Sequence, residues 1–166
     1  MTTILNRTHR CNDLSEKEIG QEVTLCGWVH TRRDHGGLIF VDLWDKYGIT
    51  QVVLNPEIDA IAHEQAHDIR GNYVIGIKGK VQARPEGMGN SKLKTGNIEV
   101  YVSELKILNI SKTPPYDIWE AEGVEESKKL KYRFLDLRSP SLQKNMRLRY
   151  HLTRIIRDVL HKNEFT

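Results

Sequence analysis

Apolar and polar residues alternate along five segments of the first 110 residues, and this period of two predicts five β-strands. The segments are residues 22–30, 38–44, 49–54, 72–84 and 97–110. Turn-forming sequences, DHGG at 34–37 and DKYG at 45–48, separate the first three segments as in a meander. The positions expected to face a common core are Val23, Leu25, Gly27, Val29, Ile39, Val41, Leu43, Ile75, Ile77, Val81, Ile98, Val100 and Val102.

A change of hydrophobic period from two to about 3.6 follows the third segment and predicts a helix over residues 58–69. Its apolar face is expected to be Ile58, Ile61, Ala62, Ala66 and Ile69. Three strands, a helix and two further strands form the element order of an OB-fold, an all-β, five-stranded Greek-key barrel with one helix. Split barrels and small α+β folds share this order and are the alternatives.

The last third of the chain has a different character. Residues 111–130 contain Pro114-Pro115 and an acidic stretch without a sustained period, which indicates a linker after an OB domain at 1–110. From 142 to 160 the pattern is helical, with an apolar stripe at Leu148, Leu152, Ile155, Ile156, Val159 and Leu160. One amphipathic helix cannot bury a core alone, so we expect residues 131–166 to be the truncated start of a second domain.

Composition is that of an ordinary globular protein, since 39% of the 166 residues are hydrophobic and 28% are charged. The sequence has neither an apolar run of about 18 residues nor a signal-peptide pattern, so we expect a cytoplasmic protein. Cys11 and Cys26 do not form a disulfide-scaffold pattern and are expected to stay reduced. Residues 1–110 carry net charge −1 and residues 111–166 carry +4, so an RNA contact in the first part must be local.

One side of the predicted barrel collects side chains suited to single-stranded RNA. Alternation turns Phe40, Gln51, Lys78, Lys80, Arg84 and Glu99 away from the core, and Arg32 and Arg33 are expected on the loop after the first strand. An exposed Phe40 would offer an unpaired base a stacking surface worth about 1–3 kcal/mol, while Gln51 and Glu99 could bond to base edges. The alternative for Phe40 is a small second core beneath a loop.

The sequence His63-Glu64-Gln65-Ala66-His67 matches HExxH, in which two histidines hold zinc and the glutamate acts as a base. Helical geometry places both histidines opposite the apolar face, towards water, and no third ligand follows on a second predicted helix. We therefore expect no metal site. Gly-rich phosphate loops, nucleophile elbows and activated carboxylate pairs are missing from the sequence, so no catalytic residue is expected in this chain.

VTLCGWVHTRRDHGGLIFVDLWDKYGITQVV, residues 23–53, resembles the anticodon-binding OB domain of bacterial aspartyl-tRNA synthetases, and KYRFLDLRSP, residues 131–140, resembles the start of their class II catalytic domain. The following helix resembles the opening of class II motif 1. The resemblance implies anticodon readers at Arg33, Phe40, Gln51, Arg84 and Glu99, with Phe40 and Gln51 on the central base and Arg84 and Glu99 on the first.

For the full-length enzyme the family implies aspartate activation with ATP and Mg²⁺, transfer to tRNA(Asp), and a homodimer. No cofactor is expected on this chain itself. His35 and Gly87 resemble the family version that also accepts tRNA(Asn), although both could be plain turn residues. The other hypotheses are a free-standing OB module for single-stranded RNA or DNA, and the OB domain of a lysyl- or asparaginyl-tRNA synthetase.

Overall fold

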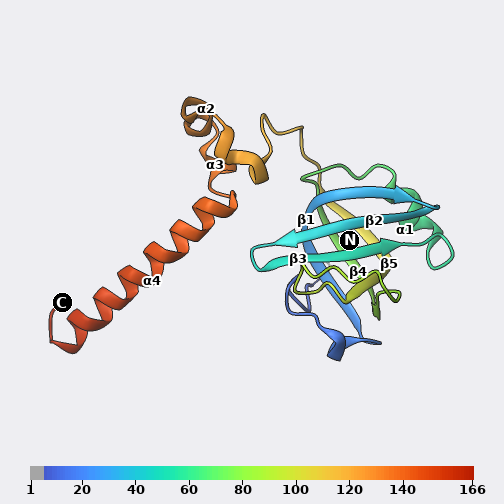
Figure 1. Ribbon diagram of the computed structural model, residues 1–166, viewed down its shortest axis with the longest axis horizontal. Helices are drawn as coiled ribbons and strands as arrows, with labels where there is room; N and C mark the ends of the chain where they lie inside the picture. The colour runs from blue at the N-terminus through green and yellow to red at the C-terminus, as the bar shows by residue number, and fades with distance from the viewer. Residues whose placement is uncertain (1–5) are drawn as a thin grey trace. The chain divides into compact units, whose positions relative to one another are not determined.

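Five strands close into a barrel in the computed structural model, which describes residues 6–166 (Figure 1). Residues 1–5 of the predicted OB domain lie outside the described part. The elements of the barrel unit are η1 (Glu16–Glu18), β1 (Glu22–His35), β2 (Leu38–Asp45), β3 (Gly48–Leu54), α1 (Ala60–Ala66), β4 (Val74–Ala83) and β5 (Ile98–Asn109). The strand order is β1-β2-β3-β5-β4 with the helix between β3 and β4, so the predicted OB-fold is confirmed.

The barrel closes where β3 and β5 pair in parallel, through Val52 with Val100 and Val53 with Tyr101. We call this short junction the seam. All other neighbouring strands are antiparallel and share longer ladders. Period two predicted the core of four strands correctly: every residue expected to face the core from β1, β2, β4 and β5 is buried, from Val23 on β1 to Val102 on β5.

Strand β1 is longer than predicted and includes both arginines. Beyond an irregularity between Val29 and Thr31 it continues to pair with β2, with Arg33 opposite Phe40 and His35 opposite Leu38. Gly36 and Gly37 close the hairpin with φ of +62° and +81°, the left-handed values that a two-residue type I′ turn requires. The prediction of a loop carrying Arg32 and Arg33 is therefore wrong, because the Gly-Gly turn lets the strands pair to their ends.

Helix α1 is shorter than predicted. Asp59 caps it, accepting a hydrogen bond from the Ala62 amide, so Ile58 lies before the helix and stays exposed. Ile61 is 72% exposed, and only Ala62, Ala66 and the following Ile69 reach the barrel core. The predicted five-residue apolar face was wrong for Ile58 and Ile61. The helix has only about two turns, and only one narrow side of it, with Ala62 and Ala66, packs against the barrel.

Residues 114–166 form a second compact unit, separate from residues up to 113. It consists of η2 (Ile118–Gly123), α2 (Glu126–Lys131), α3 (Arg133–Asp136) and α4 (Pro140–Lys162). Tyr116, Ile118, Ala121 and Leu135 are buried within it. By contrast, α4 has no buried residue, so its apolar stripe lies open along the helix. Through residues 6–166, no helix combines the length and apolar character that a membrane crossing needs.

Candidate nucleic-acid interface

Three of the predicted RNA-contacting residues are joined by hydrogen bonds on the outer face of the barrel. The guanidinium Nη2 of Arg33 donates to the Gln51 side-chain oxygen over 3.3 Å. The Gln51 amide Nε2 then donates to the Glu99 carboxylate over 3.0 Å. Gln51 thus uses its acceptor towards β1 and its donor towards β5, which fixes the orientation of its amide.

Asp42 holds the exposed end of this chain of hydrogen bonds. Its carboxylate accepts from Arg33 Nη2 over 3.0 Å and from the Thr31 hydroxyl over 2.5 Å. The Arg33 side chain is 54% exposed while that of Asp42 is 13% exposed. Such an ion pair contributes little stability at a surface, but the carboxylate sets the direction in which the guanidinium points.

Glu99 is almost completely covered, at 3% exposure, and Gln51 is also buried. Both point away from the barrel core, as predicted, yet little of either side chain reaches solvent. They are covered because each contacts the other and Glu99 also bonds to Tyr101 on β5. Burial, the nearby Glu99 charge and this hydrogen bond raise the pKa of the Tyr101 hydroxyl, which therefore stays a donor to Glu99.

Arg84 lies just after β4, beside the start of β5. Its backbone amide bonds to the Asn97 carbonyl and its Nε to the Ile98 carbonyl, over 2.9 and 3.2 Å. Its Nη2 is buried and makes no hydrogen bond within residues 6–166. A buried guanidinium donor without an acceptor is costly, so this atom is suited to a ligand that brings an acceptor.

Phe40 is half-buried on β2, directly opposite Arg33 across the β1–β2 ladder. His35 and Gly87 are exposed, His35 beside the Gly36-Gly37 turn and Gly87 in the loop between β4 and β5. His35 is the last residue of β1, the strand that carries Arg33, and the loop with Gly87 leads into β5, which carries Glu99. Both residues are therefore connected through the backbone to strands that carry the hydrogen-bonded side chains.

The remaining basic residues of the predicted face behave differently. Lys78 pairs with Glu22 over 2.8 Å, and that hydrogen bond and charge raise the pKa of the lysine. Lys80 is exposed and opposite Tyr101 in the β4–β5 ladder. Arg32 points to the other side of the hairpin from Arg33, where its Nε donates to the Ala66 carbonyl over 2.9 Å. Strand alternation thus separates the two arginines, which the sequence had grouped together.

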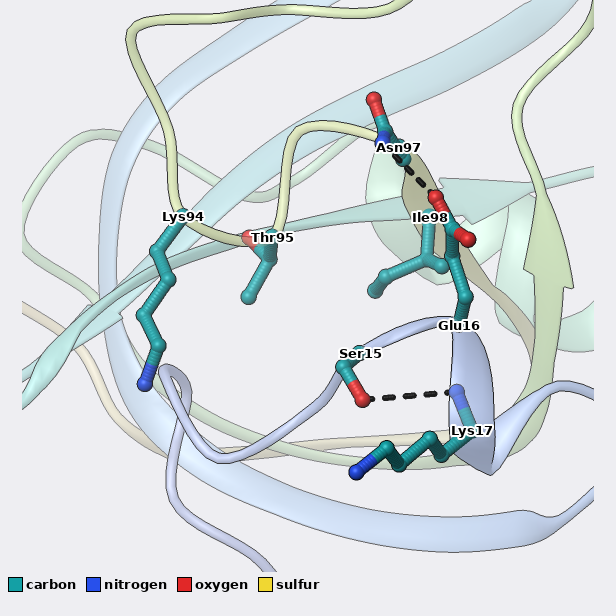
Figure 2. A pocket seen from close by; sticks show the side chains of 7 residues that line it. All are labelled: Ser15, Glu16, Lys17, Lys94, Thr95, Asn97 and Ile98. Atoms are coloured by element: carbon teal, nitrogen blue, oxygen red, sulfur yellow. Dashed lines mark hydrogen bonds between the residues drawn. The ribbon is translucent and has the colours of Figure 1, made fainter.

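A pocket of about 280 Å³ opens where η1 meets the loop before β5 (Figure 2). It is lined by Ser15, Glu16, Lys17, Lys94, Thr95, Asn97 and Ile98. Asn97 donates to Glu16 over 2.7 Å, and the buried Thr95 hydroxyl donates to the Ile49 carbonyl over 2.8 Å. Lys94 extends towards the segment that precedes η1 (Figure 2), where its Nζ donates to the Asn12 carbonyl over 3.2 Å. These contacts connect η1 to the start of the strand that carries Glu99.

The histidines of the HExxH sequence contact the β1–β2 hairpin. His63 Nε2 lies 2.9 Å from the Gly37 carbonyl, and His67 Nδ1 lies 3.5 Å from Arg32 Nη2. Their rings meet edge to face with centroids 5.1 Å apart. Within the described residues, no three His, Cys, Asp or Glu side chains gather closely enough to hold a metal ion.

A family model of tRNA anticodon domains, described as an OB-fold nucleic acid binding domain, matches residues 23–108, nearly the whole barrel. The chain belongs to this OB-fold nucleic-acid-binding family. In this OB-fold protein a second model, for class II tRNA synthetases of the D, K and N type, matches residues 125–166. The expected resemblance to class II aspartyl-tRNA synthetases is thus confirmed at both ends of the chain.

Curated relatives of this OB-fold protein support the same family. It is 51% identical over 159 residues to the aspartate–tRNA(Asp/Asn) ligase of Oleidesulfovibrio alaskensis, covering 96% of this chain and 26% of that protein. The corresponding ligase of Desulfosudis oleivorans is 53% identical over 161 residues, covering 97% of this chain and 27% of that protein. The chain therefore spans about a quarter of the length of these relatives.

Among solved structures, the aspartyl-tRNA synthetase of Entamoeba histolytica matches with a TM-score of 0.84 at 18% identity. The match covers 99% of this chain and 39% of that one, and at this identity it supports the fold. This similarity supports an OB barrel followed by helices as the fold of this chain.

Sequence reasoning missed two residues of the network, Asp42 and Tyr101. Alternation already turned both away from the core, between Val41 and Leu43 and between Val100 and Val102. The sequence pattern did not show which side chains lie next to them. Asp42 lies opposite Gln51 in the β2–β3 ladder, and Tyr101 shares a face of β5 with Glu99. A prediction that paired the strands in register would have found Asp42.

Proposed function

We propose that this chain binds the anticodon loop of tRNA on the outer face of its OB barrel, as part of an aspartate–tRNA ligase. The observation that carries the proposal is the hydrogen-bonded series Arg33, Gln51 and Glu99 beside the half-buried Phe40. Buried hydrogen-bonding groups that are already oriented discriminate between base edges, because a wrong base would leave them unpaired.

Each proposed reader has a distinct task. Phe40 offers its ring for stacking on the central anticodon base, and the Gln51 amide bonds to the edge of that base. Arg84 supplies its unpaired Nη2, and Glu99 supplies a carboxylate, to the first base. A carboxylate on an RNA-binding face would repel phosphates, so its presence supports base reading over backbone binding.

His35 and Gly87 are proposed to determine how strictly the third anticodon position is checked. The anticodons for aspartate and asparagine differ at this position, so a loose contact there would admit both tRNA(Asp) and tRNA(Asn). The exposure of His35 and Gly87 and the Asp/Asn naming of the curated relatives support this assignment. If both are only turn residues, replacing them will leave the two affinities in the same ratio.

The wider assignments rest on the family. We propose a cytoplasmic enzyme in which residues 1–110 form the anticodon-binding domain and residues 131–166 begin the catalytic domain. Residues 111–130 would be the linker between these two domains. The apolar stripe of α4 would then take part in a homodimer. The full-length enzyme would use ATP and Mg²⁺, but the described residues hold no carboxylate cluster suited to a metal. Within that enzyme, we propose RNA recognition as the contribution of this chain.

Titration of fluorescent anticodon stem-loops into the 166-residue chain tests the proposal. We expect the tRNA(Asp) and tRNA(Asn) stem-loops to bind at least tenfold more tightly than an unrelated stem-loop of equal length, since stacking and base reading each contribute about 1–3 kcal/mol. Equal affinities for all three would overturn the synthetase assignment and favour a general single-strand-binding OB module. A preference for a lysine-tRNA stem-loop would assign the chain to a different synthetase.

A further inference from the structure

Towards the turn of the β1–β2 hairpin, β1 loses its pairing with β4, while β2 stays paired with β3. The β1–β4 ladder ends at Trp28 with Val74, and the β2–β3 ladder ends at Ile39 with Leu54. From Thr31 to Asp34, β1 therefore pairs with β2 alone and forms an edge of the sheet, while the His35–Leu38 pair and the Gly36-Gly37 turn extend beyond β3. An edge strand has unpaired backbone groups on its outer side, so this segment gains from contacts with another element.

Helix α1 lies beside this part of the hairpin and is itself anchored by its contacts with the barrel core (Figure 1). Ala62, Ala66 and Ile69 are buried in the barrel core, which fixes the position of the helix backbone. From this fixed helix, His63 reaches the Gly37 carbonyl at 2.9 Å. Since a carbonyl oxygen only accepts, the His63 ring must donate from Nε2.

A second contact runs in the opposite direction, from the hairpin to the helix. Arg32 Nε donates to the Ala66 carbonyl at 2.9 Å, at the end of α1 where a cation is favoured by the helix dipole. Arg32 Nη2 also lies 3.5 Å from His67 Nδ1. The Arg32 side chain is 22% exposed, in contrast to the 54% of Arg33.

We propose that His63 and Arg32 are positioning residues that fix the reading hairpin to helix α1. The HExxH sequence then has a role without metal: its first histidine holds the Gly36-Gly37 turn and its second contacts Arg32. Because adjacent strand residues point to opposite faces, anchoring Arg32 on α1 holds Arg33 on the RNA side. The same two anchors position His35, so this inference rests on the proposed anticodon function.

The effect on the hairpin is measured first, without RNA. In wild-type protein we expect backbone amide order parameters near 0.85 at Gly36, Gly37 and Leu38, and below about 0.6 in His63→Ala. His63→Gln keeps a side-chain amide donor and should restore most of the order. Gln65→Ala, at an exposed position of the same helix, is the matched control and should leave the values unchanged. Arg32→Ala tests the second anchor by the same measurement.

Stem-loop titrations on the same variants then test the link to recognition. His63→Ala and Arg32→Ala should each weaken tRNA(Asp) stem-loop binding by about fivefold, the equivalent of one net hydrogen bond, with His63→Gln near wild type. Unchanged order parameters in both alanine variants would overturn the anchoring. A looser hairpin with unchanged affinity would overturn its role in recognition. Wild-type protein that binds no stem-loop at all would instead overturn the proposed function, while the order parameters would still report on the anchors.

Discussion

Gln51 and Glu99 join β3 to β5 through a 3.0 Å hydrogen bond between buried side chains, one residue before the strands themselves pair at Val52 and Val100. The amide of Gln51 is therefore a partner for a carboxylate with little access to water. A buried charge that loses such a partner keeps its desolvation cost without compensation. This relationship makes Gln51 important for stability as well as for RNA recognition.

Gln51→Leu should lower the free energy of unfolding by about 2 kcal/mol, because the Glu99 carboxylate loses a hydrogen bond that a buried charge needs. Urea denaturation followed by circular dichroism measures the change. Gln65→Leu, on the exposed side of α1, makes the same chemical change without a buried partner and should alter stability by less than about 0.5 kcal/mol. Equal losses in the two variants would contradict the buried pairing.

Phe40→Ala should weaken binding of the tRNA(Asp) stem-loop at least tenfold while the barrel stays folded, since stacking on one base contributes about 1–3 kcal/mol. Fluorescence anisotropy gives the dissociation constant, and the melting temperature gives the state of the fold. Phe40→Tyr retains an aromatic ring and serves as the control. An unchanged affinity for Phe40→Ala would place the RNA-binding surface elsewhere on the barrel.

Asp42→Ala should make binding more dependent on salt. Without its 3.0 Å partner, Arg33 becomes available to a phosphate, and each additional phosphate contact steepens the slope of log K against log salt by about 0.7 for single strands. Titrations at several salt concentrations measure the slope, and unrelated stem-loops should gain affinity relative to tRNA(Asp). The double variant Asp42→Ala/Arg33→Ala should lose the extra dependence. If it persists there, Arg33 is not its source.

His35→Ala should change the ratio of affinities for the tRNA(Asp) and tRNA(Asn) stem-loops by about fivefold, corresponding to one lost hydrogen bond at the third anticodon position. Phe40→Ala should weaken both complexes by the same factor, because stacking on the central base is common to them. Parallel titrations of both variants with both stem-loops provide the comparison. A constant ratio in His35→Ala would leave His35 as a turn residue.

Stability should fall as the pH rises above about 9, because the pKa of the Cys11 thiol is far above its ordinary value of 9.0. Burial is the main cause of this increase, and the nearby negative charge of Asp45 adds to it. Unfolding then releases a proton from Cys11, so stability is fully present below pH 9 and declines by up to about 1.4 kcal/mol per pH unit above it. Denaturation between pH 8 and 10 measures this slope. Cys11→Ala should remove most of it, whatever its effect on stability at pH 8.

Local sequence patterns were sufficient for the barrel and insufficient for its site. Alternation identified the buried side chains because one face of each strand packs in the core, and the change of period located α1. The same alternation placed Gln51 and Glu99 away from that core. The pattern of one strand, however, does not predict which residues of the neighbouring strands lie opposite it. Burial of Glu99 and the pairing of Arg33 with Asp42 arise from strand register and barrel closure. The length of β1 was underestimated because the predicted strand ended at residue 30 and Arg32 and Arg33 were assigned to a loop before the turn-forming residues 34–37.

The seam between β3 and β5 has a mechanical consequence for the barrel. Only two residue pairs close it on the backbone, so this junction should open before the longer antiparallel ladders do, and its amides should exchange hydrogen soonest among the strands. Gln51 and Glu99 lie at this junction, one on each side. Adjacent RNA bases, one bound by Gln51 and the next by Glu99, would link the two sides of this junction, so bound RNA should slow exchange across the whole barrel as well as at the residues it touches.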